Sequence, residues 1–125
     1  MSAERALTVV NLAAEGASAT GPYRNVVVST VNDSCLRLST FEGDYPWHLH
    51  PASDELFVVV DGVLKIDFAD GSTLTLERWD SVTVPAGVVH RTRAIGRTIN
   101  LCVERSDTET LFVDPPAAHR DGSTA

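Results

Sequence analysis

Two histidines and a glutamate lie close together in the segment WHLHPASDELF, which begins at Trp47. His48 and His50 are two residues apart, so both side chains leave the same face of a β-strand. Glu55 follows a turn-like Pro51-Ala52-Ser53-Asp54 and opens a β-prone run. A strand, a short turn and a second strand would bring one carboxylate beside two imidazoles. With positions left open for water or substrate, such groups form the ligand set of a catalytic divalent metal site.

A third histidine, His90, follows the turn-forming residues Pro85-Ala86-Gly87. The alternative interpretation is that the histidines are ordinary polar residues and that Glu55 lies at the surface. However, five apolar residues follow Glu55, and a carboxylate on such a strand needs a partner or a metal. We therefore favour a metal site of two or three histidines and one carboxylate. His119 lies in the C-terminal tail, and we do not expect it to be a ligand.

Short β segments separated by turn residues fill the chain from Val26 onward, and no long stretch has a helical period. Asp61-Gly62 is a two-residue hairpin signal, and Ile95-Gly96 is a further turn signal. So many short strands must close into a barrel or jelly roll to hide their edges. The expected strands span residues 26–31, 35–41, 47–50, 55–60, 63–68, 73–76, 81–84, 88–94 and 98–104.

The length of 125 residues predicts one domain, and the succession of short strands predicts that it is all-β. Residues 1–25 are expected to form an N-terminal strand (Leu7 to Leu12) and an arm, residues 26–113 the barrel, and residues 114–125 a flexible tail. The net charge of -7 argues against nucleic acid or an anionic membrane as partner. The N-terminus lacks signal-peptide features and no segment is long enough to span a membrane, so we expect a cytoplasmic protein. Cys35 and Cys102 are expected to be buried free thiols, in preference to a disulfide.

Two stretches resemble the sequence motifs of the cupin family. The first motif, G-x(5)-H-x-H-x(3,4)-E-x(6)-G, is matched with one residue fewer before the first histidine. The second, G-x(5)-P-x-G-x(2)-H-x(3)-N, is matched except at Trp79, where glycine is expected, and at Ala94, where asparagine is expected. The matching residues are Gly43, His48, His50, Glu55 and Gly62 in the first motif, and Pro85, Gly87 and His90 in the second.

The resemblance implies a double-stranded β-helix, the cupin jelly-roll barrel, commonly dimeric. It also implies one divalent metal ion per chain (Fe, Mn, Ni, Cu or Zn) held by His48, His50, Glu55 and His90. The sequence is similar to small single-domain cupins of the mannose-6-phosphate-isomerase-like and polyketide-cyclase-like group. That similarity favours a metal-dependent isomerase or cyclase, for example in secondary metabolism, acting on an oxygen-chelating small molecule. The alternatives are an Fe(II) dioxygenase and a non-catalytic ligand-binding or sensing cupin.

Catalytic residues other than metal ligands are weakly indicated. Tyr45 is either a general base or a loop aromatic, and Arg37 is either a substrate anchor or an exposed arginine. Thr92 shares a strand face with His90, and Asn100 shares one with Cys102, so Thr92 and Asn100 are candidates to line the cavity. Trp47 and Leu49 alternate away from the ligands, and they are expected to be either packing residues or part of a homodimer interface.

Overall fold

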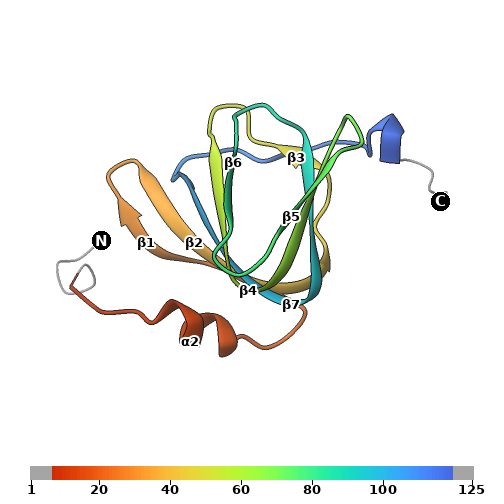
Figure 1. The fold of residues 1–125 in the computed structure, drawn as a ribbon. Helices are drawn as coiled ribbons and strands as arrows, with labels where there is room; N and C mark the ends of the chain where they lie inside the picture. The colour runs from red at the N-terminus through yellow and green to blue at the C-terminus, as the bar shows by residue number, and fades with distance from the viewer. Residues whose placement is uncertain (1–6, 120–125) are drawn as a thin grey trace.

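A curled antiparallel sheet forms the body of the molecule in the computed structural model, which describes residues 7–119 (Figure 1). The strand order is β1-β2-β7-β3-β8, and β4 pairs with β5, β6 and β7. This arrangement confirms the predicted all-β barrel. No helix in the described part of the chain is long and apolar enough to cross a membrane. The elements are α2 (Leu12–Ala17), β1 (Tyr23–Val31), β2 (Ser34–Asp44), β3 (His48–Leu49), β4 (Glu55–Phe68), β5 (Thr73–Leu76), β6 (Ser81–Val84), β7 (His90–Arg105), β8 (Leu111–Phe112) and the 3-10 turn η1 (Ala117–His119).

The strands β4 and β7 each join two segments that the sequence had predicted as separate strands. The predicted hairpin at Asp61-Gly62 and the predicted turn at Ile95-Gly96 are therefore wrong. Both strands continue past these glycines and stay paired with each other, with register shifts around Asp61. Gly62 has φ 95° and Gly96 has φ 73°, in the left-handed region that favours glycine. Glycine in this conformation lets a long strand bend at a barrel corner without reversing its direction.

The N-terminal segment forms a short helix, so the predicted strand from Leu7 to Leu12 is wrong. Asn11 caps α2, since its Oδ1 accepts a hydrogen bond from the backbone N–H of Ala14 at 2.9 Å. This cap and the alanines that follow favour a helical turn over an extended strand. The helix packs on the outside of the sheet, where a Cβ on Gly16 would lie 2.5 Å from the Ile99 side chain.

The C-terminal segment first pairs with the barrel through β8 and then extends away from the barrel. Strand β8 pairs with β3, where Phe112 is opposite His48 and Leu111 is opposite Leu49. The sequence predicted a flexible tail over residues 114–125, and the structure forms η1 within that range. Residues 120–125 of that tail lie outside the described residues, as does the side chain of His119.

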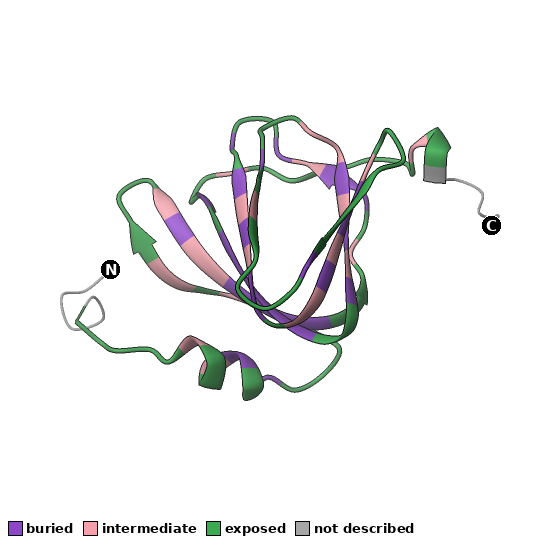
Figure 2. Cartoon of the chain, in the orientation of Figure 1, coloured by how far each residue is buried: buried purple, intermediate pink, exposed green. Residues whose placement is uncertain are grey.

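Two apolar clusters lie on the two faces of the curled sheet, as the alternating burial along the strands indicates (Figure 2). The inner cluster fills the barrel and includes Phe41, Phe57 and Ile66. The outer cluster is centred on Leu38 and Leu101. Because the inner cluster occupies only part of the interior, polar side chains line the remainder. The cysteines are free and buried, as predicted.

Candidate metal centre

The four predicted ligands lie together inside the barrel. His48 begins β3, His50 follows that strand, Glu55 begins β4 and His90 begins β7. His48 and His90 are direct partners across the β3–β7 pair. One ligand atom from each of the four residues lies within 4.8 Å of the others, and all four residues are buried. This cluster could hold a metal ion.

Backbone carbonyls fix the orientation of all three imidazole rings. The Nδ1 atoms of His48, His50 and His90 lie 2.7, 2.9 and 2.9 Å from the carbonyl oxygens of Pro46, Glu109 and Val88, respectively. Because a carbonyl oxygen only accepts hydrogen bonds, each Nδ1 must carry the hydrogen. In the neutral ring the lone pair is then on Nε2, which is the arrangement that proteins use to orient metal-ligating histidines.

Three of the converging atoms are buried without a hydrogen-bond partner in the described part of the chain: His50 Nε2, His90 Nε2 and Glu55 Oε1. The Glu55 oxygen lies 3.0 Å from His50 Nε2 and 3.4 Å from His90 Nε2. Lone pairs at such distances are stable only when a proton or a cation lies between them. Three imidazole nitrogens and one carboxylate oxygen form a donor set that suits a divalent first-row metal. The residues present therefore fit the metal that the sequence implied.

The pKa values describe the cluster when a proton takes the place of a cation. A hydrogen bond to Glu55 raises the pKa of His50 to about 9. Burial raises the pKa of Glu55, but hydrogen bonds from His50 and His90 outweigh burial and leave this pKa at about 2. Burial lowers the pKa of His48 to about 4, so this ring is neutral at physiological pH. Without a cation, His50 is therefore protonated and its charge balances that of Glu55. A metal ion that binds must displace this proton, and it then meets three neutral imidazoles and one carboxylate.

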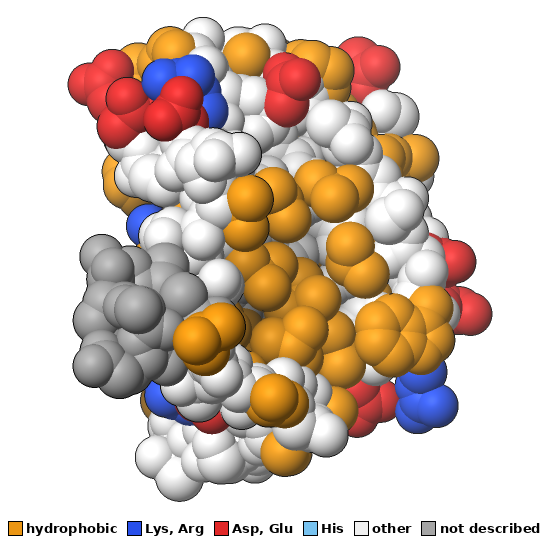
Figure 3. Space-filling model, turned by 90° about the vertical axis from the view of Figure 1, so that its left-hand side faces the viewer, with side chains coloured by type: hydrophobic (Ala, Val, Ile, Leu, Met, Phe, Trp, Pro, Cys, Tyr) orange, Lys and Arg blue, Asp and Glu red, His pale blue; other side chains and the backbone are white. Residues whose placement is uncertain are grey.

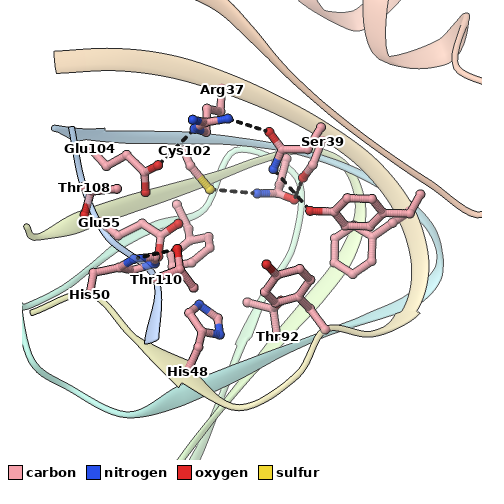
Figure 4. A pocket seen from close by; sticks show the side chains of 16 residues that line it. Arg37, Ser39, His48, His50, Glu55, Thr92, Cys102, Glu104, Thr108 and Thr110 are labelled. Atoms are coloured by element: carbon pink, nitrogen blue, oxygen red, sulfur yellow. Dashed lines mark hydrogen bonds and ion pairs between the residues drawn. The ribbon is translucent and has the colours of Figure 1, made fainter. Parts of the chain in front are cut away.

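A cavity of about 290 Å³ opens beside the cluster (Figure 4). His48, His50 and Glu55 form part of its wall. The remaining wall is mostly polar, which suits a ligand with several hydrogen-bonding groups. The other lining residues are Tyr23, Asn25, Arg37, Ser39, Phe41, Tyr45, Phe57, Thr92, Asn100, Cys102, Glu104, Thr108 and Thr110.

Both weakly indicated catalytic residues line this cavity. The ring of Tyr45 meets the ring of His48 edge-on, with centroids 5.1 Å apart. Burial, followed by the nearby Tyr23, raises the pKa of Tyr45, which favours a proton donor over a general base. Arg37 points into the cavity wall, where its Nε donates to Glu104 at 3.0 Å, and its side chain is 34% exposed.

The structure places Thr92 and Asn100 in the cavity wall, as the strand alternation predicts. It does not leave Trp47 available for an interface. Trp47 is 4% exposed, and the guanidinium carbon of Arg91 lies 4.9 Å from the centroid of its ring. Of the two expected roles, packing is therefore confirmed for Trp47 and a role in a dimer surface is wrong, because contacts within the chain already cover this side chain.

Sequence reasoning missed Glu104, which is 7% exposed and lines the cavity. Glu104 could have been recognised from the alternation of side chains along β7, in which every second residue points to the same face. Asn100 and Cys102 were expected on one face, and a further step of two reaches Glu104. Tyr23, Asn25 and Ser39 were also missed, because β1 and β2 carry no ligand motif from which their inward face can be recognised.

An antiparallel barrel with three histidines and one carboxylate converging inside it defines the class of protein. Residues 38–104 match the family model described as Cupin domain, and the chain belongs to the cupin superfamily. This result confirms the family that the motifs predicted. Pro85, Gly87 and His90 of the second motif lie in the matched range, and Trp79 adopts φ 68° where the motif has glycine.

The similar proteins support the same fold. The chain is 51% identical over 92 residues to Uncharacterized protein YdbB of Bacillus subtilis (strain 168), covering 74% of this chain and 81% of that protein. A cupin-2 domain containing protein from Shewanella frigidimarina NCIMB 400 superposes with a TM-score of 0.73 at 29% identity, over 78% of this chain and 94% of that one. Protein NMB1881 from Neisseria meningitidis gives a TM-score of 0.71 at 28% identity, over 79% and 100%.

Proposed function

We propose that this cupin is a metal-dependent enzyme of the isomerase or cyclase type, acting on a small molecule that chelates the metal through oxygen atoms. The observation that carries the proposal is the convergence of buried, unpartnered ligand atoms on the wall of a polar cavity. His48, His50, Glu55 and His90 would hold one divalent ion. When bound, such an ion supplies Lewis acidity toward substrate oxygens.

The remaining cavity residues would orient the substrate and exclude water from it. Tyr45, held beside His48, keeps its phenol proton and can donate it to a substrate oxygen. Thr92 and Asn100 are buried polar residues in the same wall. A site built in this way favours reactions that move protons and rearrange bonds within one molecule.

Metal content tests the first part of the proposal. Protein purified without chelator is expected to carry close to one divalent ion per chain by elemental analysis. The double variant His48→Ala/His50→Ala should lose this ion, because two of the four ligands are removed. The matched control is His119→Ala, since we do not expect this histidine to be a ligand. Stoichiometric metal in the double variant would show that the ligand assignment is wrong.

The open coordination positions are tested with Co(II), whose visible spectrum reports on its ligands. We expect the spectrum of Co(II)-loaded protein to change when acetohydroxamate, a bidentate oxygen ligand, is added. An unchanged spectrum would indicate a closed, structural metal site.

Turnover then separates the classes of reaction. Chelated protein should lose activity, retain its fold and recover activity with several divalent ions in anaerobic buffer. Recovery with Fe(II) alone, with oxygen consumed in step with product, would instead identify an oxygenase. Tight ligand binding without metal-linked turnover would favour a sensing cupin.

A further inference from the structure

A second buried carboxyl group lies in the cavity, outside the candidate metal cluster. Glu104 comes from β7 and is 7% exposed. Its Oε2 accepts a hydrogen bond from Arg37 Nε at 3.0 Å, and Arg37 Nη1 donates to Asn25 Oδ1 at 3.4 Å. Arg37 thus binds one of the two carboxylate oxygens of Glu104, Oε2. This oxygen of Glu104 is therefore fixed.

Figure 4 draws Glu104 between Arg37 and the Glu55–His50 pair. Burial raises the pKa of Glu104, and the negative charge of Glu55 raises it further, against the opposing effects of His50 and Arg37. A raised pKa makes this carboxylate a stronger proton acceptor than an ordinary glutamate. The titratable or charged groups that face it are Glu55 on β4, His50 after β3, Arg37 on β2, Tyr45 before β3 and Cys102 on β7.

We propose that Glu104 is the proton-transfer residue of this cavity, that Arg37 positions it, and that the substrates are small α-hydroxycarbonyl compounds. This inference rests on the function proposed above. Glu104 Oε1 takes a proton from the carbon that carries the hydroxyl group, and the electron pair of the broken C–H bond forms a C=C bond. Glu104 then returns the proton to the neighbouring carbon, while the hydroxyl proton moves to the former carbonyl oxygen. Atoms and electrons balance within one substrate, and no oxidant or reductant is needed.

Three observations favour Glu104 for this step. It is a carboxyl group in the cavity wall without a place in the metal cluster. Its contact with Arg37 gives it a defined orientation, as a proton-transfer group requires. The alternative acid in the wall, Tyr45, has a raised pKa and is a poor acceptor of a carbon-bound proton.

A cavity of about 290 Å³ limits the ligand to a small molecule.

The test uses the Zn(II)-loaded full chain and 1,3-dihydroxyacetone as probe in D₂O. Loss of carbon-bound hydrogen is followed by proton NMR. Wild-type protein is expected to exchange this hydrogen, and Glu104→Gln to slow the exchange at least about 100-fold. Glu104→Asp should recover part of the rate. Glu42→Gln, which removes an exposed carboxylate from β2, is the matched control and should exchange at the wild-type rate.

Two further measurements separate proton transfer from a structural role. The exchange rate of wild-type protein should rise with pH as Glu104 loses its proton, and Glu104→Gln should lack this rise. Arg37→Met should shift the midpoint of the rise upward, since it removes a positive charge beside the carboxylate. Zinc content and acetohydroxamate binding, followed by calorimetry, should stay at wild-type values in Glu104→Gln.

The outcomes distinguish this inference from the proposed function. Exchange by Glu104→Gln at the wild-type rate would overturn the role of Glu104. Absence of exchange in wild-type protein that binds zinc and acetohydroxamate would overturn proton transfer but leave the chelating metal site in place. Absence of zinc binding in wild-type protein would overturn both.

Discussion

Asp67 shows how one buried carboxylate holds the strand that carries His90. Its side chain accepts hydrogen bonds from Arg93 Nε at 2.6 Å, Thr73 Oγ1 at 2.6 Å and Arg91 Nη2 at 2.8 Å. Burial raises the pKa of Asp67, but these three residues outweigh burial and hold it well below its usual value. Asp67 lies on β4 and both arginines lie on β7. The cluster therefore fixes the register of these strands next to His90.

Replacing this carboxylate should weaken the fold in a pH-dependent way. At pH 7 we expect Asp67→Asn to lower the free energy of unfolding by roughly 2 to 4 kcal/mol, because two arginines lose their buried partner. A depressed folded-state pKa contributes stability that is present above the unfolded value, about 3.9, and is lost as pH falls below it. The difference between wild type and variant should therefore shrink below about pH 4. Urea denaturation between pH 3 and pH 7 measures it.

The control for this prediction is Asp61→Asn. Asp61 pairs with Arg78 at 3.3 Å, but both side chains are more than half exposed. An exposed pair contributes little, so a change below about 1 kcal/mol is expected. A difference between wild type and Asp67→Asn that stays constant from pH 3 to pH 7 would contradict the role of the Asp67 charge.

At the scale of elements, the bends in β4 and β7 bring the ends of distant segments to one site. Glu55 begins β4 and His90 begins β7, and both strands pair with each other on either side of their bends. Gly62 is confined at its bend, because an added Cβ would lie 2.6 Å from Thr98 Oγ1. Gly96 has free space around it, since no heavy atom beyond its two chain neighbours would lie within 4 Å of an added Cβ. The two glycines thus share a left-handed φ but differ in their surroundings.

This difference predicts unequal costs for two matched substitutions. Gly96→Ala should lower the free energy of unfolding by about 1 kcal/mol through backbone strain alone. Gly62→Ala should lower it by about 3 kcal/mol, because steric overlap with Thr98 adds to the same strain. Urea denaturation of both variants checks the prediction. Equal losses would show that the close approach to Thr98 does not matter.

At the scale of the whole molecule, hydrophobic side chains gather on the face that carries β1 and β2 (Figure 3). We call this the outer face. Strand β1 pairs only with β2 among the described strands, so its other edge is open. An apolar groove of about 510 Å³ lies on this face. The residues that define the outer face are Val26, Val27, Val28, Leu36 and Val103.

We predict that two chains associate through the outer face, because an open strand edge beside exposed apolar side chains favours pairing. Light scattering at micromolar concentration should give a mass near 27 kDa, twice the 13.5 kDa of one chain. Val103→Arg should shift the protein toward the monomer, since it places a charge at the predicted interface.

Leu74→Arg is the matched control for the dimer. Leu74 lies on β5 and is 41% exposed, close to the 37% of Val103. This variant should stay dimeric. Wild-type protein that scatters as a single chain at micromolar concentration would rule out the predicted assembly.

The sequence was sufficient to predict most strand positions and the part of the ligand cluster formed by His48, His50 and Glu55, because these depend on local chemistry. Alternation placed His48 and His50 on one face, and Glu55 followed after a short turn. The break expected between the strands at 26–31 and 35–41 is a two-residue turn at Asn32-Asp33, where Asn32 has φ 52°. Each of these features involves residues close in the chain, so a local pattern carries the information.

Only the tertiary structure decided the features that depend on distant partners. A glycine with positive φ is compatible both with a hairpin turn and with a bend in a continuous strand. The pairing of β4 with β7 on both sides of Asp61 shows that Asp61-Gly62 is a bend. Trp47 is covered by Arg91, which lies over its ring. Glu104 is held in the cavity wall by a hydrogen bond from Arg37 on another strand. Local sequence determines which face a side chain occupies, whereas the closure of the barrel determines what that face meets.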